Sequence, residues 1–164
     1  MNDFLHLRID NRLLHGQVVQ YWLGHLEIAH LVIADDTVAR NNAMSIIYRM
    51  ALPNNVDLSI VPIHRLPAAI SKFNSSPSMV LVKDVYDLAQ GIMCGAHFNR
   101  VTLGNVHSAP DRTRVTDSVY LSQEEEQTLA RLQNEGVQIE IQTFPGEILH
   151  LEVAPEGEVR WLKQ

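Results

Sequence analysis

Short apolar runs alternate along this chain with longer stretches in which apolar residues recur at helical spacing. Two of the runs, Ile60-Val61 and Val80-Leu81-Val82, are entirely aliphatic, which is typical of strands covered on both faces. Alternation of such strands with helical segments indicates βαβ units. The pattern predicts strands near residues 3–9, 28–34, 56–62, 78–83, 99–104 and 137–143.

Helical periodicity fills the segments between these strands. The first predicted helix carries apolar residues at helical spacing, namely Val18, Val19, Trp22, Leu23 and Leu26. The second runs from about Val38 to Met50 and is stopped by the following Pro53. The last begins at Ser122, which precedes a run of glutamates in a capping signature, and ends near Gly136. Two shorter helices are predicted over about 64–73 and 84–94.

This order of elements predicts an α/β fold with a single open, mostly parallel β-sheet and helices on both faces. With 164 residues, a single domain spanning 1–164 is expected. The polar stretch 74–78 is interpreted as a turn between a helix and a strand rather than a linker. From about residue 145 the pattern is least constrained, with turn signals and one closing edge strand over 159–162.

Composition narrows the functional classes. The net charge of -6 argues against nucleic-acid binding through a broad basic surface. No apolar stretch reaches the roughly 18 to 20 residues of a membrane span, and the N-terminus lacks a signal-peptide pattern. Cys94 is the single cysteine, which fits a cytoplasmic location. Because glycine-rich nucleotide motifs and metal-ligand spacings of histidine are absent from the sequence, neither a cofactor nor a metal is expected.

Ligands of such folds bind at the carboxyl ends of the strands. That rule places four polar segments on one rim: Asp10–His15, Asp35-Asp36, Lys83-Asp84 and Gly104–His107. The two aspartates are interpreted mainly as helix caps, with a partner contact as the lesser alternative, because adjacent carboxylates rarely aim at one point. Lys83 either adds positive potential to the rim or is an ordinary solvated lysine.

His15 is the main candidate for chemistry. It follows a strand and a polar turn, begins a helical pattern, and has Arg12 three residues before it. A neutral imidazole is a nucleophile near neutral pH, and a guanidinium matches phosphate oxygens bidentately. Helix-terminal N–H groups would add to the binding of a phosphoryl group. The alternatives are a capping or surface histidine and a solvated loop arginine.

The run Arg-Ile-Asp-Asn-Arg-Leu-Leu-His-Gly-Gln-Val at residues 8–18 closely resembles the opening of the IIB components of the bacterial sugar phosphotransferase system (PTS), of the mannose/fructose/sorbose/N-acetylgalactosamine family. The resemblance covers about the first 145 residues. It implies that His15 is phosphorylated on Nδ1 by a IIA component and passes the group to a sugar imported by the membrane components IIC and IID. The activity would be that of a protein-N(pi)-phosphohistidine–sugar phosphotransferase, located in the cytoplasm at the inner face of the membrane and often paired as a homodimer.

The same resemblance assigns supporting parts. Arg12 would clamp the phosphoryl group, and Gly16, Gly104 and His107 would support its binding, although an exposed loop histidine is an equal alternative for His107. Asp10 either orients a neighbour or forms an Asx-turn. Asn11 lies at a variable position of the motif and receives no chemical role.

The loop after the fifth strand departs from the family pattern at Val106 and again at Asp111-Arg112. Its Gly-Asn-x-His form leans towards members that handle N-acetylgalactosamine or galactosamine. The departures keep open a non-catalytic regulatory or binding paralogue with the same fold. A small-ligand enzyme on a flavodoxin-like fold is a third, weaker alternative.

Overall fold

A computed structural model describes residues 4–73 and 75–163. The protein is built around one large sheet. The sheet has 8 strands in the order β10-β9-β8-β5-β1-β4-β2-β3. Six of them run parallel, while β9 and β10 are antiparallel additions at one edge. The strands are β1 Leu5–Asp10, β2 His30–Ala34, β3 Asp57–Val61, β4 Ser78–Val82, β5 Arg100–Asn105, β8 Gln138–Ile141, β9 Leu149–Val153 and β10 Val159–Lys163. The predicted mostly parallel open sheet is confirmed, as are all the strands predicted before the tail.

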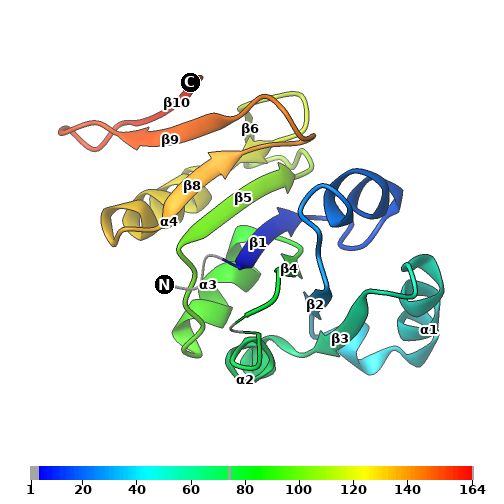
Figure 1. Cartoon of the computed structure of the whole chain (residues 1–164). Coiled ribbons are helices and arrows are strands. Elements are labelled where there is room, and N and C mark those ends of the chain that lie inside the picture. The colour runs from blue at the N-terminus through cyan, green and yellow to red at the C-terminus, as the bar shows by residue number, and fades with distance from the viewer. Residues whose placement is uncertain (1–3, 74, 164) are drawn as a thin grey trace.

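Helices cover both faces of this sheet (Figure 1). The π-helix η1 and helix α1 lie on one face, and α2, α3 and α4 lie on the other. The helical elements are η1 Val18–Leu23, η2 Val38–Arg40, α1 Asn42–Ala51, η3 Ile63–Arg65, α2 Leu66–Ile70, α3 Val85–Met93 and α4 Gln123–Asn134.

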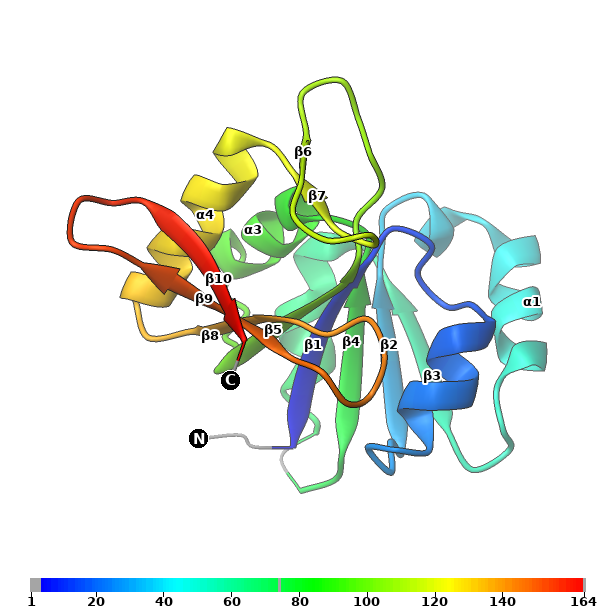
Figure 2. The same cartoon turned by 90° about the horizontal axis from the view of Figure 1, so that it is seen from above.

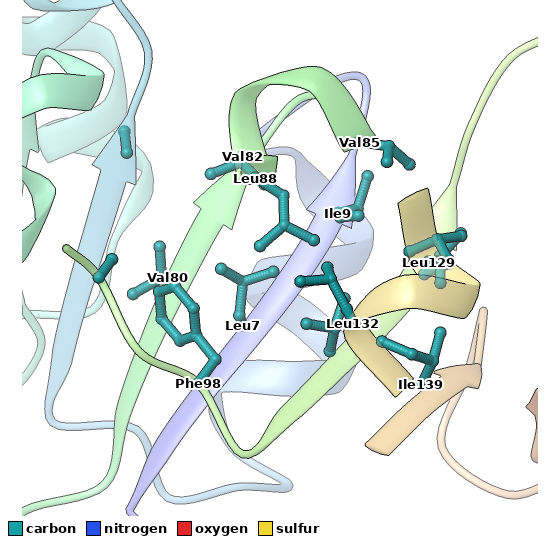
Figure 3. Packing of buried hydrophobic residues seen from close by; sticks show 14 of the residues in the cluster. Leu7, Ile9, Val80, Val82, Val85, Leu88, Phe98, Leu129, Leu132 and Ile139 are labelled. Atoms are coloured by element: carbon teal, nitrogen blue, oxygen red, sulfur yellow. The ribbon is translucent and has the colours of Figure 1, made fainter. Parts of the chain in front are cut away.

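Two hydrophobic clusters hold these layers together, one on each face. Because side chains alternate along a strand, Leu7 and Ile9 of β1 point towards α3 and α4, where they pack with Leu88 and Leu129 (Figure 3). On the opposite face, Trp22 of η1 belongs to the cluster that contains Tyr48 of α1, with these other buried members: Leu13, Leu14, Val18, Leu23, Ile28, Leu31, Ile33, Val38, Met79 and Leu81. The neighbouring residues Arg8 and Asp10 therefore face the η1 side.

Three of the predicted helices differ from the observed ones in length or winding. The helix expected over 38–50 is split, because Asn41 leaves helical geometry and its side chain caps the Met44 N–H. The first helix is a π-helix that ends at Leu23, short of the predicted Leu26. The helix expected over 64–73 is reduced to η3 and the five residues of α2. Capping of α4 by Ser122 is confirmed.

The tail forms a β-hairpin rather than one edge strand. β10 was predicted, whereas β9, which pairs with both β8 and β10, was not. A second small hairpin, β6 Thr113–Arg114 with β7 Tyr120–Leu121, lies in the long loop after β5 and was also missed. The predicted turn over 74–78 begins at Asn74, outside the described residues, and Ser78 opens β4.

The loops that follow β1 and β5 meet beyond the carboxyl ends of these two central strands (Figure 2). The Asn11 N–H donates to the Asn105 carbonyl at 3.0 Å, so the two loops are joined through their backbones. At the same place the pairing of β1 with β5 shifts register between Ile9 and Asp10, which leaves Gly104 as an extra residue in β5. Within residues 4–73 and 75–163, no helix is long and apolar enough to cross a membrane.

Candidate active site

The loop after β1 is held in one conformation by its two leucines. Leu13 has a positive φ of 54°, which is unfavourable for a residue with a branched side chain. Both Leu13 and Leu14 are buried in the cluster on the η1 side, and this burial offsets the strain. The Leu13 N–H also donates to the Asp10 carbonyl at 2.9 Å. His15 is thereby presented directly before the helical segment that contains η1.

Asp10 is the centre of the loop. Its side chain is only 1% exposed. One carboxylate oxygen, Oδ1, accepts a hydrogen bond from the Arg12 backbone N–H at 3.1 Å, which is an Asx-turn. The other, Oδ2, lies 2.8 Å from His15 Nε2. Both of the roles considered for Asp10 from the sequence, the local turn and the orientation of a neighbour, are therefore present together.

The contact with Asp10 decides which ring nitrogen of His15 is free. A carboxylate can only accept hydrogen bonds, so Nε2 must carry the proton and donate it to Oδ2. In the neutral ring Nδ1 then keeps its lone pair. The side chain is 15% exposed, so it is held by the protein yet still reached by solvent. This arrangement suits Nδ1 as a nucleophile.

Arg12 lies beside the same carboxylate. Its Nε is 3.9 Å from Asp10 Oδ1, and its Nη2 donates to Gln17 Oε1 at 3.0 Å. The amide of Asn105 satisfies its neighbours when its nitrogen donates to the Ser118 carbonyl and its oxygen accepts from Arg12 Nε at 3.2 Å. The guanidinium is 46% exposed, so part of it is available to an incoming anion. Asn105, which sequence reasoning left without a role of its own, is therefore a neighbour of Arg12.

The two glycines of the predicted site differ from each other. Gly16 is exposed, and a Cβ placed there would meet nothing within 4 Å, so space does not require glycine. Gly104 is buried, and a Cβ there would lie 2.0 Å from Nη2 of Arg8. The space beside Gly104 is therefore filled by an arginine from β1. This packing requires glycine at position 104 whether or not its backbone also supports a phosphoryl group.

His107 lies farther along the same loop, where its side chain is exposed and its carbonyl accepts from Arg112 Nη1 at 2.9 Å. Arg112 is itself held by Glu125, to which it donates two hydrogen bonds of 2.9 and 2.7 Å. Arg112, one of the departures from the family pattern, thus ties the loop after β5 to α4.

The remaining rim residues are structural. Asp35 caps the turn before η2, since its Oδ1 accepts from the N–H groups of Thr37 and Val38, as expected. Asp36 instead accepts from the Ile63 N–H, so the two carboxylates do not form a pair.

Lys83 is partly solvated, with 42% of its side chain exposed, but it is not a free positive charge. Its Nζ lies 3.2 Å from Asp35 Oδ2 and 2.5 Å from Asp87 Oδ2. Burial alone would lower the pKa of Lys83, but the hydrogen bonds and negative charges of these two carboxylates outweigh burial and raise it. Lys83 therefore neutralises buried acids on the rim. Among the described residues, 4–73 and 75–163, no group of three or more His, Cys, Asp or Glu could hold a metal ion.

Arg8 is a second residue near this site, besides Asn105, to which sequence reasoning gave no role. It lies on the same face of β1 as Asp10, and its Nε is 3.9 Å from Asp10 Oδ2. The signal was available in the alternation of β1, where Arg8 and Asp10 sit two residues apart with opposite charges. Reading the strand only as an apolar run hid that polar face.

Comparison with known proteins identifies the family. Residues 4–150 match the family described as PTS system sorbose subfamily IIB component. The chain is 22% identical over 149 residues to the fructose-specific EIIB component of Bacillus subtilis, covering 90% of this chain and 91% of that protein. It is 26% identical over 150 residues to the N-acetylgalactosamine-specific IIB component 1 of Escherichia coli, covering 88% and 93%. It also matches 45% of the longer mannose-specific EIIAB component of Escherichia coli at 21% identity.

Solved structures agree on the fold. The crystal structure of manxB from Thermoanaerobacter tengcongensis is 29% identical, with a TM-score of 0.77 over 89% of this chain and 91% of that one. A PTS-dependent N-acetyl-galactosamine IIB component from Streptococcus pyogenes has a TM-score of 0.79 at 22% identity, covering 86% and 88%, and supports the fold alone. With the family match extending over nearly the whole chain, the protein belongs to the sorbose-subfamily IIB components of the sugar phosphotransferase system.

Proposed function

We propose that this IIB component is a phosphocarrier that accepts a phosphoryl group on Nδ1 of His15 from a phosphorylated IIA component. It then passes the group to a sugar imported by the membrane components IIC and IID. The observation that carries the proposal is the 2.8 Å contact between His15 Nε2 and Asp10 Oδ2, because it leaves Nδ1 with its lone pair. The whole chain, including the β9–β10 hairpin, would act as one IIB domain.

Each step exchanges one bond to phosphorus. In the first, the lone pair of His15 Nδ1 attacks the phosphorus and the bond from phosphorus to the IIA histidine breaks, so the IIA imidazole leaves with the electron pair. In the second, a sugar hydroxyl oxygen attacks the phosphorus and gives its proton to solvent, while the bond from phosphorus to Nδ1 breaks and the His15 imidazole leaves with the electron pair.

Arg12 would carry the charge compensation in both steps. Its partly exposed guanidinium is held by Gln17, which follows His15, and by Asn105 at the end of β5, and it can pair with phosphoryl oxygens. The helical segment that contains η1 begins directly after His15, so the dipole of its first turn would add to this compensation. No metal or organic cofactor takes part in the proposed transfer.

The sugar is proposed from the loop after β5, whose Gly-Asn-x-His form favours N-acetylgalactosamine or galactosamine. Relatives named for fructose, mannose, N-acetylgalactosamine and sorbose share 21–26% identity with this chain, so their names support the family rather than one sugar. Docking on IIC and IID would bring the chain to the inner face of the membrane. A homodimer, implied by the family resemblance, can be checked by sedimentation.

The test is transfer of label from phosphorylated IIA. Wild type is expected to take up one phosphoryl group that is labile in acid and stable in base, and His15→Gln is expected to take up none. His97→Gln is the matched control, because it removes an exposed histidine that precedes the amino end of β5 and has no part in the proposed site.

Two results would contradict the proposal. If wild type takes up no label, the regulatory or binding paralogue becomes the better description. If His15→Gln takes up as much label as wild type, the phosphorylated residue is a different one. Tight binding of a nucleotide or flavin by the wild type would favour the small-ligand enzyme.

A further inference from the structure

The guanidinium of Arg8 is caged inside the protein although no part of the proposed chemistry uses it. The side chain is 4% exposed. It lies 4.4 Å from the centre of the Trp22 ring, a cation–π contact. Its Nη1 and Nη2 donate to the carbonyls of Gln142 and Thr143 at 2.7 and 3.1 Å. Trp22 Nε1 also donates to the Thr143 carbonyl, at 3.3 Å, which ties the two side chains to one backbone segment.

The bulge in β5 makes room for this cage. Gly104 is the extra residue at the register shift opposite Ile9 and Asp10. The Arg8 guanidinium occupies the space that a side chain at this position would fill. A Cβ at this position would come within 2.0 to 2.5 Å of three atoms of Arg8, so any other residue would displace the arginine. β1, η1, β5 and the segment after β8 together leave Arg8 one orientation.

That orientation directs the third nitrogen towards Asp10. Arg8 Nε is buried, makes no hydrogen bond to any residue of the described chain, and lies 3.9 Å from Asp10 Oδ2. The same Oδ2 accepts the proton of His15 Nε2. Burial lowers the pKa of Arg8 to about 10, against the opposing pull of Asp10, so the group stays charged at neutral pH. It therefore offsets the charge of a carboxylate that is almost fully buried.

We propose that Arg8 is a positioning residue for phosphoryl transfer, which acts on His15 only through Asp10. The caged guanidinium holds the Asp10 carboxylate in place, Asp10 holds the Nε2 proton of His15, and Nδ1 is left free to attack. This inference rests on the proposed phosphorylation of His15. It differs from the role of Arg12, whose exposed guanidinium faces the incoming anion.

The test is a double-mutant cycle on the first-order rate constant of His15 phosphorylation at saturating phosphorylated IIA. Arg8→Met and Asp10→Asn are each expected to lower the rate constant by about 10- to 100-fold, as for other residues that orient a reactive group through a neighbour. The double variant is expected to be no slower than Asp10→Asn alone, because Arg8 has nothing left to act on. The matched control is Arg100→Met, which removes an exposed arginine from β5 and should leave the rate unchanged.

Losses that multiply in the double variant would overturn the proposal, since Arg8 would then act independently of Asp10. Arg8→Lys covers the case in which Arg8→Met does not fold: it keeps the charge but cannot reach two carbonyls at once. Its rate is expected to fall about tenfold, and this loss should vanish in the Asp10→Asn background. A lysine variant as fast as wild type would contradict the positioning role.

Nitrogen-15 NMR of the unphosphorylated protein separates this inference from the proposed function. In the neutral ring of wild type, His15 should show a protonated, hydrogen-bonded Nε2 and a bare Nδ1. Arg8→Lys should weaken that hydrogen bond, while Arg100→Met should not. A protonated Nδ1 in wild type, or unchanged spectra in Arg8→Lys, would refute the role of Arg8 whether or not IIA phosphorylates the chain. Failure of labelling alone would refute the proposed function.

Discussion

Asp10 accepts hydrogen bonds with both carboxylate oxygens, and each bond serves a different purpose. Through Oδ1 it shapes the loop at the Arg12 N–H, and through Oδ2 it sets the ring of His15. Side chains that share a carboxylate in this way are coupled, so a change at one is felt by the others. At the residue scale, the site is therefore one unit built around a buried acid, with Arg8 beneath it and Arg12 at the surface.

Arg12→Ala tests the surface side of that unit. Removing the clamp is expected to slow transfer from phosphorylated IIA by at least about tenfold, because hydrogen bonds to a charged phosphoryl group contribute roughly 1.5–3 kcal/mol. The melting temperature should change by only about 1–2 °C, since the side chain is 46% exposed and its removal leaves no buried group unpaired. A parallel fall of several degrees in thermal melting would mark Arg12 as structural instead.

The three longest helices, α1, α3 and α4, begin where a side chain accepts a hydrogen bond from a backbone N–H of the first turn. Asn41, Asp84 and Ser122 each accept from the backbone N–H three residues on. Asp84 and Ser122 stood at the predicted helix starts, whereas Asn41 lay inside the helix predicted over 38–50. α4 adds the reciprocal bond, in which the Ser122 N–H donates to Glu125 Oε2 at 2.9 Å. Glu125 also binds Arg112, so this cap connects α4 to the loop that carries His107.

Ser122→Ala is expected to destabilise the protein by about 1 kcal/mol, because the Glu125 N–H loses its acceptor. For a chain of this size that corresponds to a fall of about 2–4 °C in melting temperature. Ser71→Ala is the matched control, since its exposed hydroxyl bonds only to the preceding turn and should leave the melting temperature nearly unchanged. Equal shifts in the two variants would argue against the capping box.

Across the whole molecule, burial falls from the centre of the sheet to the edge formed by β9 and β10. Every residue of β4 is buried, between β1 and β2, whereas β10 is the outermost strand and all of its residues are exposed or half-buried. The family match ends at residue 150, so most of the β9–β10 hairpin lies beyond it. Local opening is easiest where few apolar contacts must be broken.

Amide hydrogen exchange of the full chain tests this gradient. Amides of β4 are expected to exchange only through global unfolding, and those of β10 to exchange about 100-fold faster or more through local opening. Equal protection in β4 and β10, measured by NMR or mass spectrometry, would show that the hairpin unfolds together with the centre of the sheet.

Prediction from the sequence succeeded where the signal was local. Strand positions, the cap at Ser122 and the loop from Asp10 to His15 depend on residues close together in the chain. The π-helical winding of η1 and the break at Asn41 were missed, because periodicity counts apolar positions and does not register a competing cap. β9 was missed because it becomes a strand by pairing with β8 and β10.

By itself, then, the sequence determined the α/β class, the strands before the tail, the rim on which Arg12 and His15 lie, and the resemblance to IIB components. Only the tertiary structure decided which residues pack beneath the loop that carries Arg12 and His15. Arg8 meets the Gln142 carbonyl across 134 positions of sequence, and it reaches the space at Gly104 through a register shift between two strands. Hydrophobic periodicity records which face of an element is buried, but the partner on that face is set by strand order and register.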